Sequence, residues 1–296
     1  MKYQEFIENV KEHISTQLPA SHKVVLHPVL KNNSTVYDGL IILDPVLNIS
    51  PTIYLNPYYH RYLSGVDMED IYDDILKSYW DHLPKKDFDI SVFTDYSKAR
   101  KNILIKLINK EKNASLLQDV PHVIFHDLAI VFLCGIYNHR NEFGTILIHN
   151  QHMEHWNVTV DELYKVGMEN TPKFLPFRLD SIDKILDQYE DDNILLPLDA
   201  LQISLLTNKR RVNGATCMVY PTLLKRIADF FNDDLIIIPS SIHEVLIIPE
   251  SIIREEYSLE DYREMITQVN EEHLPDDEML SNHAYLFLKE TEELVY

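Results

Sequence analysis

The chain has 296 residues, of which 45% are apolar and 10% aromatic, enough for a buried core in one large domain or two ordinary ones. It has 27 Lys and Arg against 47 Asp and Glu, a net charge of −20, and 6 glycines. The charge repels a phosphate backbone and the glycine content argues against a long glycine-rich phosphate loop, so we expect no direct binding to nucleic acid.

The N-terminal part of the chain predicts helices and strands in alternation. Apolar residues at helical spacing predict helices over 2–18, from Asp67 to about His82, over 97–108 and, in a short piece, over 111–118. Alternating apolar residues and turn residues predict a hairpin of two strands and one further short strand, at 22–30, 35–43 and 51–55.

From residue 121 onward, β-branched and aromatic residues become dense, and we expect strands on both sides of the polar segment 141–144. A capping box from Thr159 to Glu162 predicts a helix over about 160–170. Another short helix is expected within 180–193.

The stretch 201–250 has the most regular pattern. Two apolar runs, 201–207 and 215–220, flank the pair Asn213-Gly214 and predict a hairpin. A helix is expected after Pro221 and ends at Asn232. Strands are predicted at 235–238 and 244–248, each closed by a proline. We expect 239–249 to form a central strand with both faces covered, because apolar residues occupy both of its faces.

The final 46 residues, 251–296, contain 13 acidic and 3 basic residues, a net charge of −10. A capping box from Ser258 to Asp261 begins an acidic helix here, and 282–288 could add an edge strand. The whole pattern predicts an α+β fold with antiparallel sheets. We divide it into an N-terminal region to residue 118, a C-terminal region over 119–250 and an acidic C-terminal segment over 251–296.

The two cysteines, Cys134 and Cys217, lie in separate apolar runs, which is typical of reduced, buried thiols. The N-terminal stretch MKYQEFIENVKEH has no apolar signal core, and the longest apolar run, around 128–137, is about half of a membrane span. The sequence therefore predicts a soluble cytoplasmic protein without a cofactor, a cysteine-based metal site or a membrane partner.

The chain contains the motifs PTIYLNPYY, DVPHVIFHDLAIVF, ILIHNQHMEHW, NKRRVNGA and IPSSIHEVLIIP. With these motifs, nearly the whole chain resembles an uncharacterised domain-of-unknown-function family of gut Gram-positive bacteria. More distantly, 146–249 resembles another uncharacterised cytoplasmic family of bacilli, in which a helix ending in Glu-Asn-Thr precedes a Pro-Ser-Ser-x-His-Glu strand. Neither resemblance implies an activity or catalytic residues.

Ser241, His243 and Glu244 have the chemistry of a hydrolase triad. In a strand, however, His243 and Glu244 point to opposite faces, and Ser241 and His243 lie roughly 6.5 Å apart on one face, beyond hydrogen-bond reach. A local triad is therefore disfavoured. The open interpretations are a structural or binding role, or an active site completed by residues elsewhere.

His149, His152 and His155, with Glu154 between them, form a second cluster that could bind metal. The His-Glu-x-x-His spacing of a zinc protease is absent, so the alternative is that these histidines cap a helix or face solvent. Polar or aromatic residues also occur at two expected strand ends, in His126-Asp127 and in the segment 58–60. We interpret both as completing the edge of a core.

Lys209, Arg210 and Arg211 form a dense basic cluster in an acidic chain, and a loop there would present several donors to a carboxylate or phosphate. The alternative is that the loop binds acids of the same chain. We expect a non-catalytic binding or interaction protein with a protein partner. The alternatives are a hydrolase using Ser241 or His243, and an acidic mimic of nucleic acid.

Overall fold

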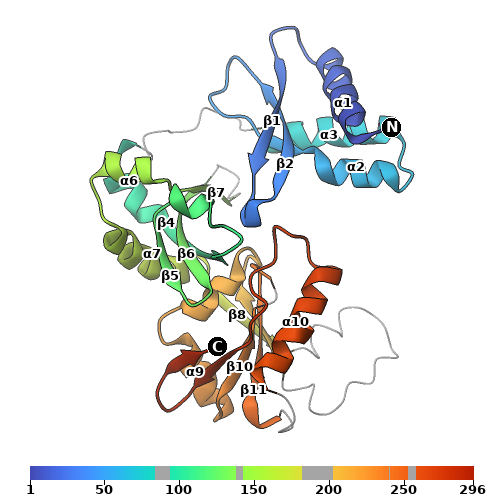
Figure 1. Ribbon diagram of the computed structural model, residues 1–296. Helices are drawn as coiled ribbons and strands as arrows, with labels where there is room; N and C mark the ends of the chain where they lie inside the picture. Colours follow the sequence, from blue (N-terminus) through green and yellow to red (C-terminus); the bar gives the residue numbers. More distant parts are fainter. Residues whose placement is uncertain (84–93, 138–142, 182–202, 240, 253–257) are drawn as a thin grey trace. The chain divides into compact units, whose positions relative to one another are not determined.

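The computed structural model describes residues 1–83, 94–137, 143–181, 203–239, 241–252 and 258–296 (Figure 1). The chain forms two compact units, Met1–Ser91 (unit 1) and Val92–Tyr296 (unit 2). The break lies nearer the N-terminus than residue 118, where the sequence divides into regions. The physical reason is that β4 (Ile103–Asn109) pairs with β6 (Leu128–Tyr137), which ties the residues before 118 to those after it.

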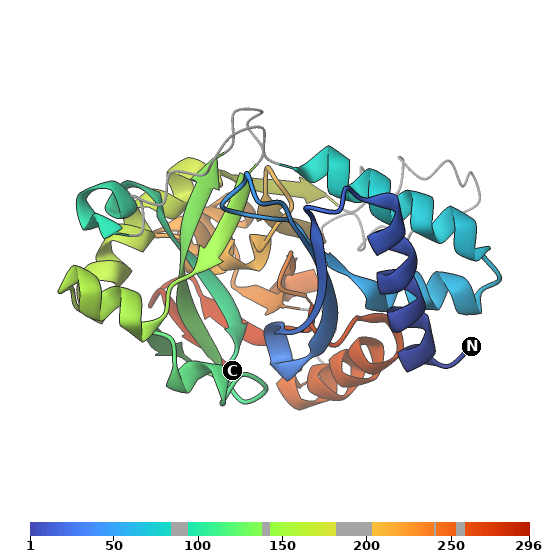
Figure 2. The same cartoon turned by 90° about the horizontal axis from the view of Figure 1, so that it is seen from above.

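Unit 1 is a three-stranded sheet with helices on one face. The strands β1 (Lys23–Leu30), β2 (Val36–Leu43) and β3 (Thr52–Tyr54) pair antiparallel in sequence order, and a short 3₁₀ turn joins the first two as predicted. α1 (Tyr3–Gln17) runs alongside the hairpin in both views (Figures 1 and 2).

The helices of unit 1 bury the apolar stripes that predict them. α1 buries Phe6, Val10 and Ile14, and α3 (Met68–His82) buries Ile71 and Ile75. The aromatic segment after β3 forms an additional helix, α2 (Leu55–Leu63). These side chains form one core cluster with Leu40 and Ile42 of the sheet.

Unit 2 contains two sheets. In the four-stranded sheet, β6 pairs with β4, β5 (His122–Phe125) and β7 (Phe143–Leu147). α7 (Val160–Phe174) begins at the predicted capping box, with Thr159 Oγ1 accepting from the Glu162 N–H. It packs against β4, and its Thr171 hydroxyl accepts the β4 backbone N–H of Ile105 at 2.9 Å.

The second sheet of unit 2 has the order β13-β12-β10-β11-β9-β8. Its strands are β8 (Phe177–Ser181), β9 (Ser204–Asn208), β10 (Leu235–Ile238), β11 (Val245–Pro249), β12 (Tyr285–Leu288) and β13 (Glu293–Val295). One face joins a core shared with the four-stranded sheet, and α10 (Leu259–His273) covers the other through Tyr262 and Ile266. Both faces of the central strand β11 are therefore covered, as predicted.

The remaining helical pieces are short or connect these sheets. They are α5 (Tyr96–Ala99), η2 (Arg100–Asn102), η3 (Leu116–Gln118), α6 (Asn150–Trp156), η6 (Gly214–Val219), α9 (Leu223–Phe231) and η7 (Glu250–Ile252). Asn232 ends α9 with a left-handed φ of 58°, as the sequence indicates.

Every described strand pair is antiparallel, so the predicted α+β fold with antiparallel sheets is confirmed. Across the described ranges, no helix has both the length and the apolar character needed to span a bilayer. The helix expected within 180–193 lies largely outside the described residues, and 180–181 end strand β8.

Two predicted elements are wrong, and a third forms as a strand but not at the edge of its sheet. The helix expected over 97–108 is a helical turn followed by strand β4, whose two faces are both buried, so its apolar residues show no helical period. The strand expected at 215–220 is the 3₁₀ helix η6, because β8 and β11 already occupy the two edges of β9. The edge strand expected over 282–288 is β12, which pairs on both sides, and β13 forms the edge.

Candidate functional site

The candidate site joins two segments that the sequence marks separately. One is the turn after β9, residues 208–214, here named the basic turn. The other is residues 241–244, here named the histidine segment, which precedes β11. The Asn213 backbone N–H donates to His243 Nδ1 at 3.2 Å, and the Thr207 hydroxyl at the end of β9 donates to the His243 carbonyl oxygen at 2.7 Å.

The basic turn is held by its own hydrogen bonds. The Asn208 side chain accepts the Arg210 backbone N–H at 2.9 Å and donates to the Val212 carbonyl oxygen at 2.7 Å. Such bonds from an Asn side chain to nearby backbone groups fix a turn without a β ladder. Arg211 and Asn213 have positive φ angles of 54° and 52°, a conformation that costs energy for a side chain as large as arginine.

Gly214 lets the basic turn approach the histidine segment. A Cβ atom at this position would lie 2.1 Å from Thr207 Oγ1 and 2.3 Å from the His243 carbonyl oxygen. The Ala215 N–H also donates to the Ile242 carbonyl oxygen, at 3.2 Å. The two segments are therefore packed at backbone distance, and only glycine fits at their junction.

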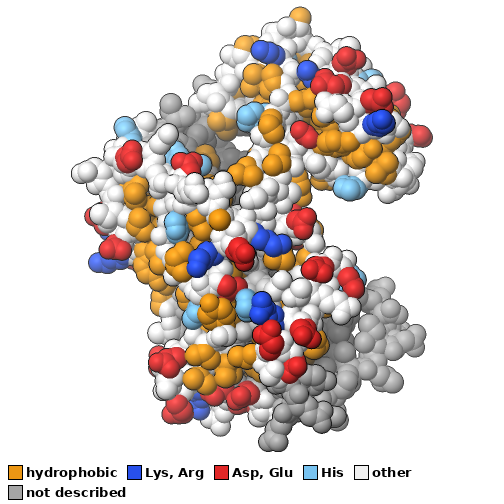
Figure 3. Space-filling model, viewed as in Figure 1, with side chains coloured by type: hydrophobic (Ala, Val, Ile, Leu, Met, Phe, Trp, Pro, Cys, Tyr) orange, Lys and Arg blue, Asp and Glu red, His pale blue; other side chains and the backbone are white. Residues whose placement is uncertain are grey.

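The basic turn presents its charges to solvent. The side chains of Lys209, Arg210 and Arg211 are all exposed. Among the described acids, none lies within salt-bridge distance of Lys209 or Arg211. On the face drawn in Figure 3, acidic side chains are interspersed with basic, apolar and neutral ones rather than gathered in one field.

The histidine segment leaves the strand that the sequence predicts for it. Ser241 forms an isolated bridge with Met279, and the Ile242 N–H donates to the Glu278 carbonyl oxygen at 2.8 Å. Regular pairing therefore begins only at Val245. The predicted alternation of faces is correct within β11 and does not extend to residues 241–243.

The contacts of His243 show which ring nitrogen accepts a hydrogen bond and which carries the proton of the neutral ring. Because Nδ1 accepts a backbone N–H, the neutral ring carries its proton on Nε2. Nε2 lies 3.9 Å from Glu278 Oε1, too far for a hydrogen bond, and the two side chains are 32% and 41% exposed. The ring is thus oriented by the basic turn and reaches solvent beside a carboxylate.

Ser241 and His243 do not form a catalytic pair in the described contacts. The Ser241 hydroxyl oxygen accepts the backbone N–H of His243 at 3.1 Å, while Nδ1 of the ring is bonded to Asn213. Glu244 is half-buried before β11. Burial raises the pKa of the nearby Cys217 thiol to about 12, so this group is protonated at neutral pH and is not a nucleophile.

Two histidines of the second cluster, His149 and His152, lie at the start of α6, and His155 lies in its last turn. His149 is its N-cap, its Nδ1 lies 2.7 Å from Asp119 Oδ2, and its backbone N–H donates to His152 Nδ1 at 2.9 Å. Burial and the neighbouring His149 lower the pKa of His152. Within the described ranges, no three His, Cys, Asp or Glu side chains are grouped to hold a metal ion.

Three residues at the candidate site escape the sequence analysis. Asn208 has a local signal, an Asn at the end of a strand, which favours a turn of this type. Thr207 and Glu278 have none, because their roles depend on a contact with His243 across 36 and 35 positions of the chain.

His126 and Asp127 do lie at a core edge. Asp127 accepts hydrogen bonds from the hydroxyl groups of Ser281, at 2.6 Å, and of Tyr285. Both partners are fully buried, so this carboxylate connects the β5–β6 turn to the second sheet.

No match is found among curated proteins or among solved structures. A family model does match, over residues 3–289, and its description is a family of unknown function, DUF5688. Because the match spans nearly the whole chain, this protein belongs to the DUF5688 family.

Proposed function

We propose that this protein is a non-catalytic binding module whose basic turn holds a carboxylate or phosphate group of a protein partner. The observation that carries this proposal is a turn of fixed geometry that exposes three cationic side chains, Lys209, Arg210 and Arg211. The setting that we propose is the cytoplasm of a gut Gram-positive bacterium.

The chemistry of the basic turn suits an anion. Arg offers a planar fork of donors that matches the two oxygens of a carboxylate or phosphate, and Lys adds a point charge. Because hydrogen bonds within the turn fix its backbone, less conformational entropy is lost when a ligand is held. In a chain with a net charge of −20, a local basic site also restricts where an acidic partner can approach.

The hydrolase alternative has less support from the contacts of the site. A general base must reach the proton that it removes, and the His243 ring is bonded to Asn213 instead of to Ser241. The alternative of an acidic nucleic-acid mimic requires a contiguous acidic field, and on the face drawn in Figure 3 the described acids are interspersed with other side chains.

The test is fluorescence anisotropy with two labelled peptides, one of six glutamates and one with a single phosphoserine, which distinguish the carboxylate from the phosphate. In the triple variant Lys209→Ala, Arg210→Ala, Arg211→Ala we expect affinity for the preferred peptide to fall at least about tenfold.

The matched control is the triple variant Lys98→Ala, Arg100→Ala, Lys101→Ala, which removes the same charge from exposed positions in α5 and η2. If both triple variants lose the same affinity, net charge alone explains the loss, and the proposal is overturned. Failure of wild-type protein to bind either peptide would also contradict it, and turnover of a generic ester that Ser241→Ala abolishes would replace it with the hydrolase.

A further inference from the structure

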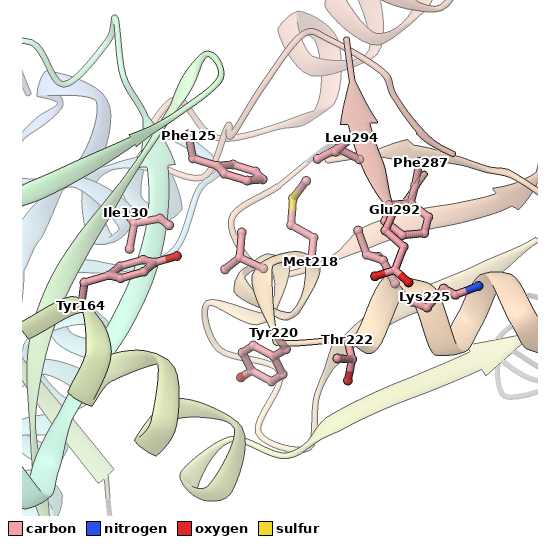
Figure 4. A pocket seen from close by; sticks show the side chains of 12 residues that line it. Phe125, Ile130, Tyr164, Met218, Tyr220, Thr222, Lys225, Phe287, Glu292 and Leu294 are labelled. Atoms are coloured by element: carbon pink, nitrogen blue, oxygen red, sulfur yellow. The ribbon is translucent and has the colours of Figure 1, made fainter. Parts of the chain in front are cut away.

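Unit 2 contains a half-open pocket away from the groups discussed above, with a volume of about 230 Å³ (Figure 4). We name it the aromatic pocket. Its wall contains Phe125 from β5, Tyr164 from α7 and Phe287 from β12, together with the apolar side chains of Ile130, Met218 and Leu294. Pockets for drug-sized ligands span roughly 300–1,000 Å³, so this one suits a single ring or a short alkyl chain.

Two polar groups point into this apolar space. Figure 4 shows the Tyr164 hydroxyl directed toward the pocket from one side and the Glu292 carboxylate directed toward it from the other. Lys225 contributes its aliphatic stem to the wall, while its nitrogen points away from the centre. Lys225 Nζ instead donates to Asp229 Oδ1 at 2.9 Å.

The side chains at the mouth of the aromatic pocket carry a net negative charge. The hydrogen bond to Asp229 raises the pKa of Lys225, and the charges of Glu292 and Glu290 raise it further. Glu290 also lies 4.0 Å from Lys289 Nζ. The carboxylates of Asp229, Glu290 and Glu292 therefore face two ammonium groups, those of Lys225 and Lys289, which leaves one net negative charge. An anionic ligand would meet this charge directly, whereas a cation would neutralise part of it.

Glu292 is also held in place by its backbone. It has a left-handed φ of 59°, and its N–H donates to the Leu288 carbonyl oxygen at 2.8 Å, which closes the hairpin between β12 and β13. A turn residue with positive φ is more often Gly, Asn or Asp. The hairpin therefore places a carboxylate at the pocket on a fixed backbone.

We infer that the aromatic pocket binds a small organic amine in its protonated form, with the ammonium group at Glu292 and the apolar body between Met218 and the aromatic rings. Aromatic faces attract cations through their quadrupole, and a carboxylate beside them adds an ion pair. The Tyr164 hydroxyl offers a polar contact on the opposite side. This site is independent of the basic turn, which has the opposite charge.

The experiment compares three ligands that share a phenyl ring and a two-carbon chain: 2-phenylethylamine, 2-phenylethanol and phenylacetate. Each is titrated into the full chain by ligand-observed NMR, up to about 10 mM because a ligand of this size can bind in the millimolar range. We expect the amine to bind at least about tenfold more tightly than the alcohol, and phenylacetate to show no saturation.

Two charge variants assign the site. Glu292→Gln should weaken binding of the amine about tenfold and leave the alcohol unchanged, since only the charge is removed. Glu293→Gln is the matched control, because it removes the same charge from the next exposed residue, outside the pocket lining. Its amine affinity should equal that of the wild type.

A third variant, Leu294→Phe, fills the aromatic pocket and should weaken the amine and the alcohol together, with the melting temperature as the check on folding. The inference is overturned if the wild type does not bind the amine, if the three ligands bind alike, or if Glu292→Gln and Glu293→Gln have equal effects on the amine.

Discussion

The contacts within unit 1 join residues that are nearer to each other in the sequence, whereas the contacts within unit 2 join residues that are farther apart in the sequence. The sheet of unit 1 follows the sequence, with β1, β2 and β3 as successive neighbours, whereas the six-stranded sheet of unit 2 places β13 and β8 at opposite edges and the strands between them out of order. Hydrogen bonds between residues distant in the sequence show the same difference between the units. Tyr72 reaches Asn9 across 63 positions in unit 1, and Asn109 reaches Leu280 across 171 in unit 2.

This comparison explains where the candidate sites lie. A unit with local connections can complete its core from neighbouring elements, as α1, α2 and α3 do around their sheet. In unit 2, closing the sheets brings segments together that are distant in the sequence. The basic turn and its histidine segment meet in this way, and so do the strands and helices that line the aromatic pocket. Binding residues are commonly found on loops that a scaffold positions.

The largest effect is expected from Phe6→Ala in unit 1. Phe6 is fully buried, and the loss of an aromatic core side chain costs about 3–5 kcal/mol. If the units are stabilised separately, amide hydrogen exchange should accelerate in residues 3–83 and remain unchanged in β4 and β6. If β4 and β6 lose as much protection from exchange as residues 3–83, the two units are not stabilised separately.

A smaller but still severe loss is expected from Gly214→Ala in unit 2. The added methyl group would overlap Thr207 Oγ1 and the His243 carbonyl oxygen, so we expect a loss of about 2–4 kcal/mol in urea denaturation. Gly144→Ala is the control, since no described atom other than those of its two chain neighbours lies within 4 Å of a Cβ placed there. Similar midpoints for both variants would contradict the close contact.

His243→Ala should lower the stability of unit 2 by about 1–2 kcal/mol, because the Asn213 N–H loses its acceptor. The measurement is the melting temperature, with the exposed His155→Ala as control. An unchanged melting temperature together with loss of ligand binding or turnover would assign His243 a functional role instead of a structural one.

The smallest effect concerns pH and again distinguishes unit 2, which contains both thiols. Burial raises the pKa of Cys134 from 9.0 to about 11 and of Cys217 from 9.0 to about 12. Because the pKa of each thiol is higher in the folded state than in the unfolded state, the folded state has its full stability at pH values below the unfolded pKa. This stability is lost as the pH rises from the unfolded pKa toward the folded pKa. At pH 9, half-ionisation should lower the free energy of unfolding by about 0.4 kcal/mol for each unfolded thiol, or about 0.8 kcal/mol for the two together.

Urea midpoints of unit 2 measured between pH 7 and pH 9 give this slope. The double variant Cys134→Ala, Cys217→Ala starts from a lower stability, since both side chains are in the core. Its dependence on pH should nevertheless be flatter than that of the wild type. Parallel slopes would mean that other groups cause the alkaline loss.

Elements whose signals are local could be predicted from the sequence. α1 and α3 follow from stripes of apolar residues, and α7 and α10 from capping boxes at Thr159 and Ser258. The β1–β2 hairpin and the strands β10 and β11 follow from alternation and turn residues. In each case, the residues that determine the element lie within one or two turns or strands of each other.

Tertiary structure decided the elements that have no local period. The run ILIKLIN is a strand because β6 supplies a partner, and the run 215–220 is a 3₁₀ helix because β9 has no edge left for it. An apolar segment buried on all sides fits a helix or a strand equally well in sequence.

The same division holds for the candidate sites. The sequence by itself determined the basic residues and the Asn213-Gly214 turn, since charge and turn preference belong to single residues and their neighbours. Only the tertiary structure decided that Asn213 contacts His243 and that Glu292 and Tyr164 line one pocket, because these pairs come from segments 30 and 128 positions apart. Contacts of that range depend on how whole sheets pair and pack, and no local pattern of side chains encodes them.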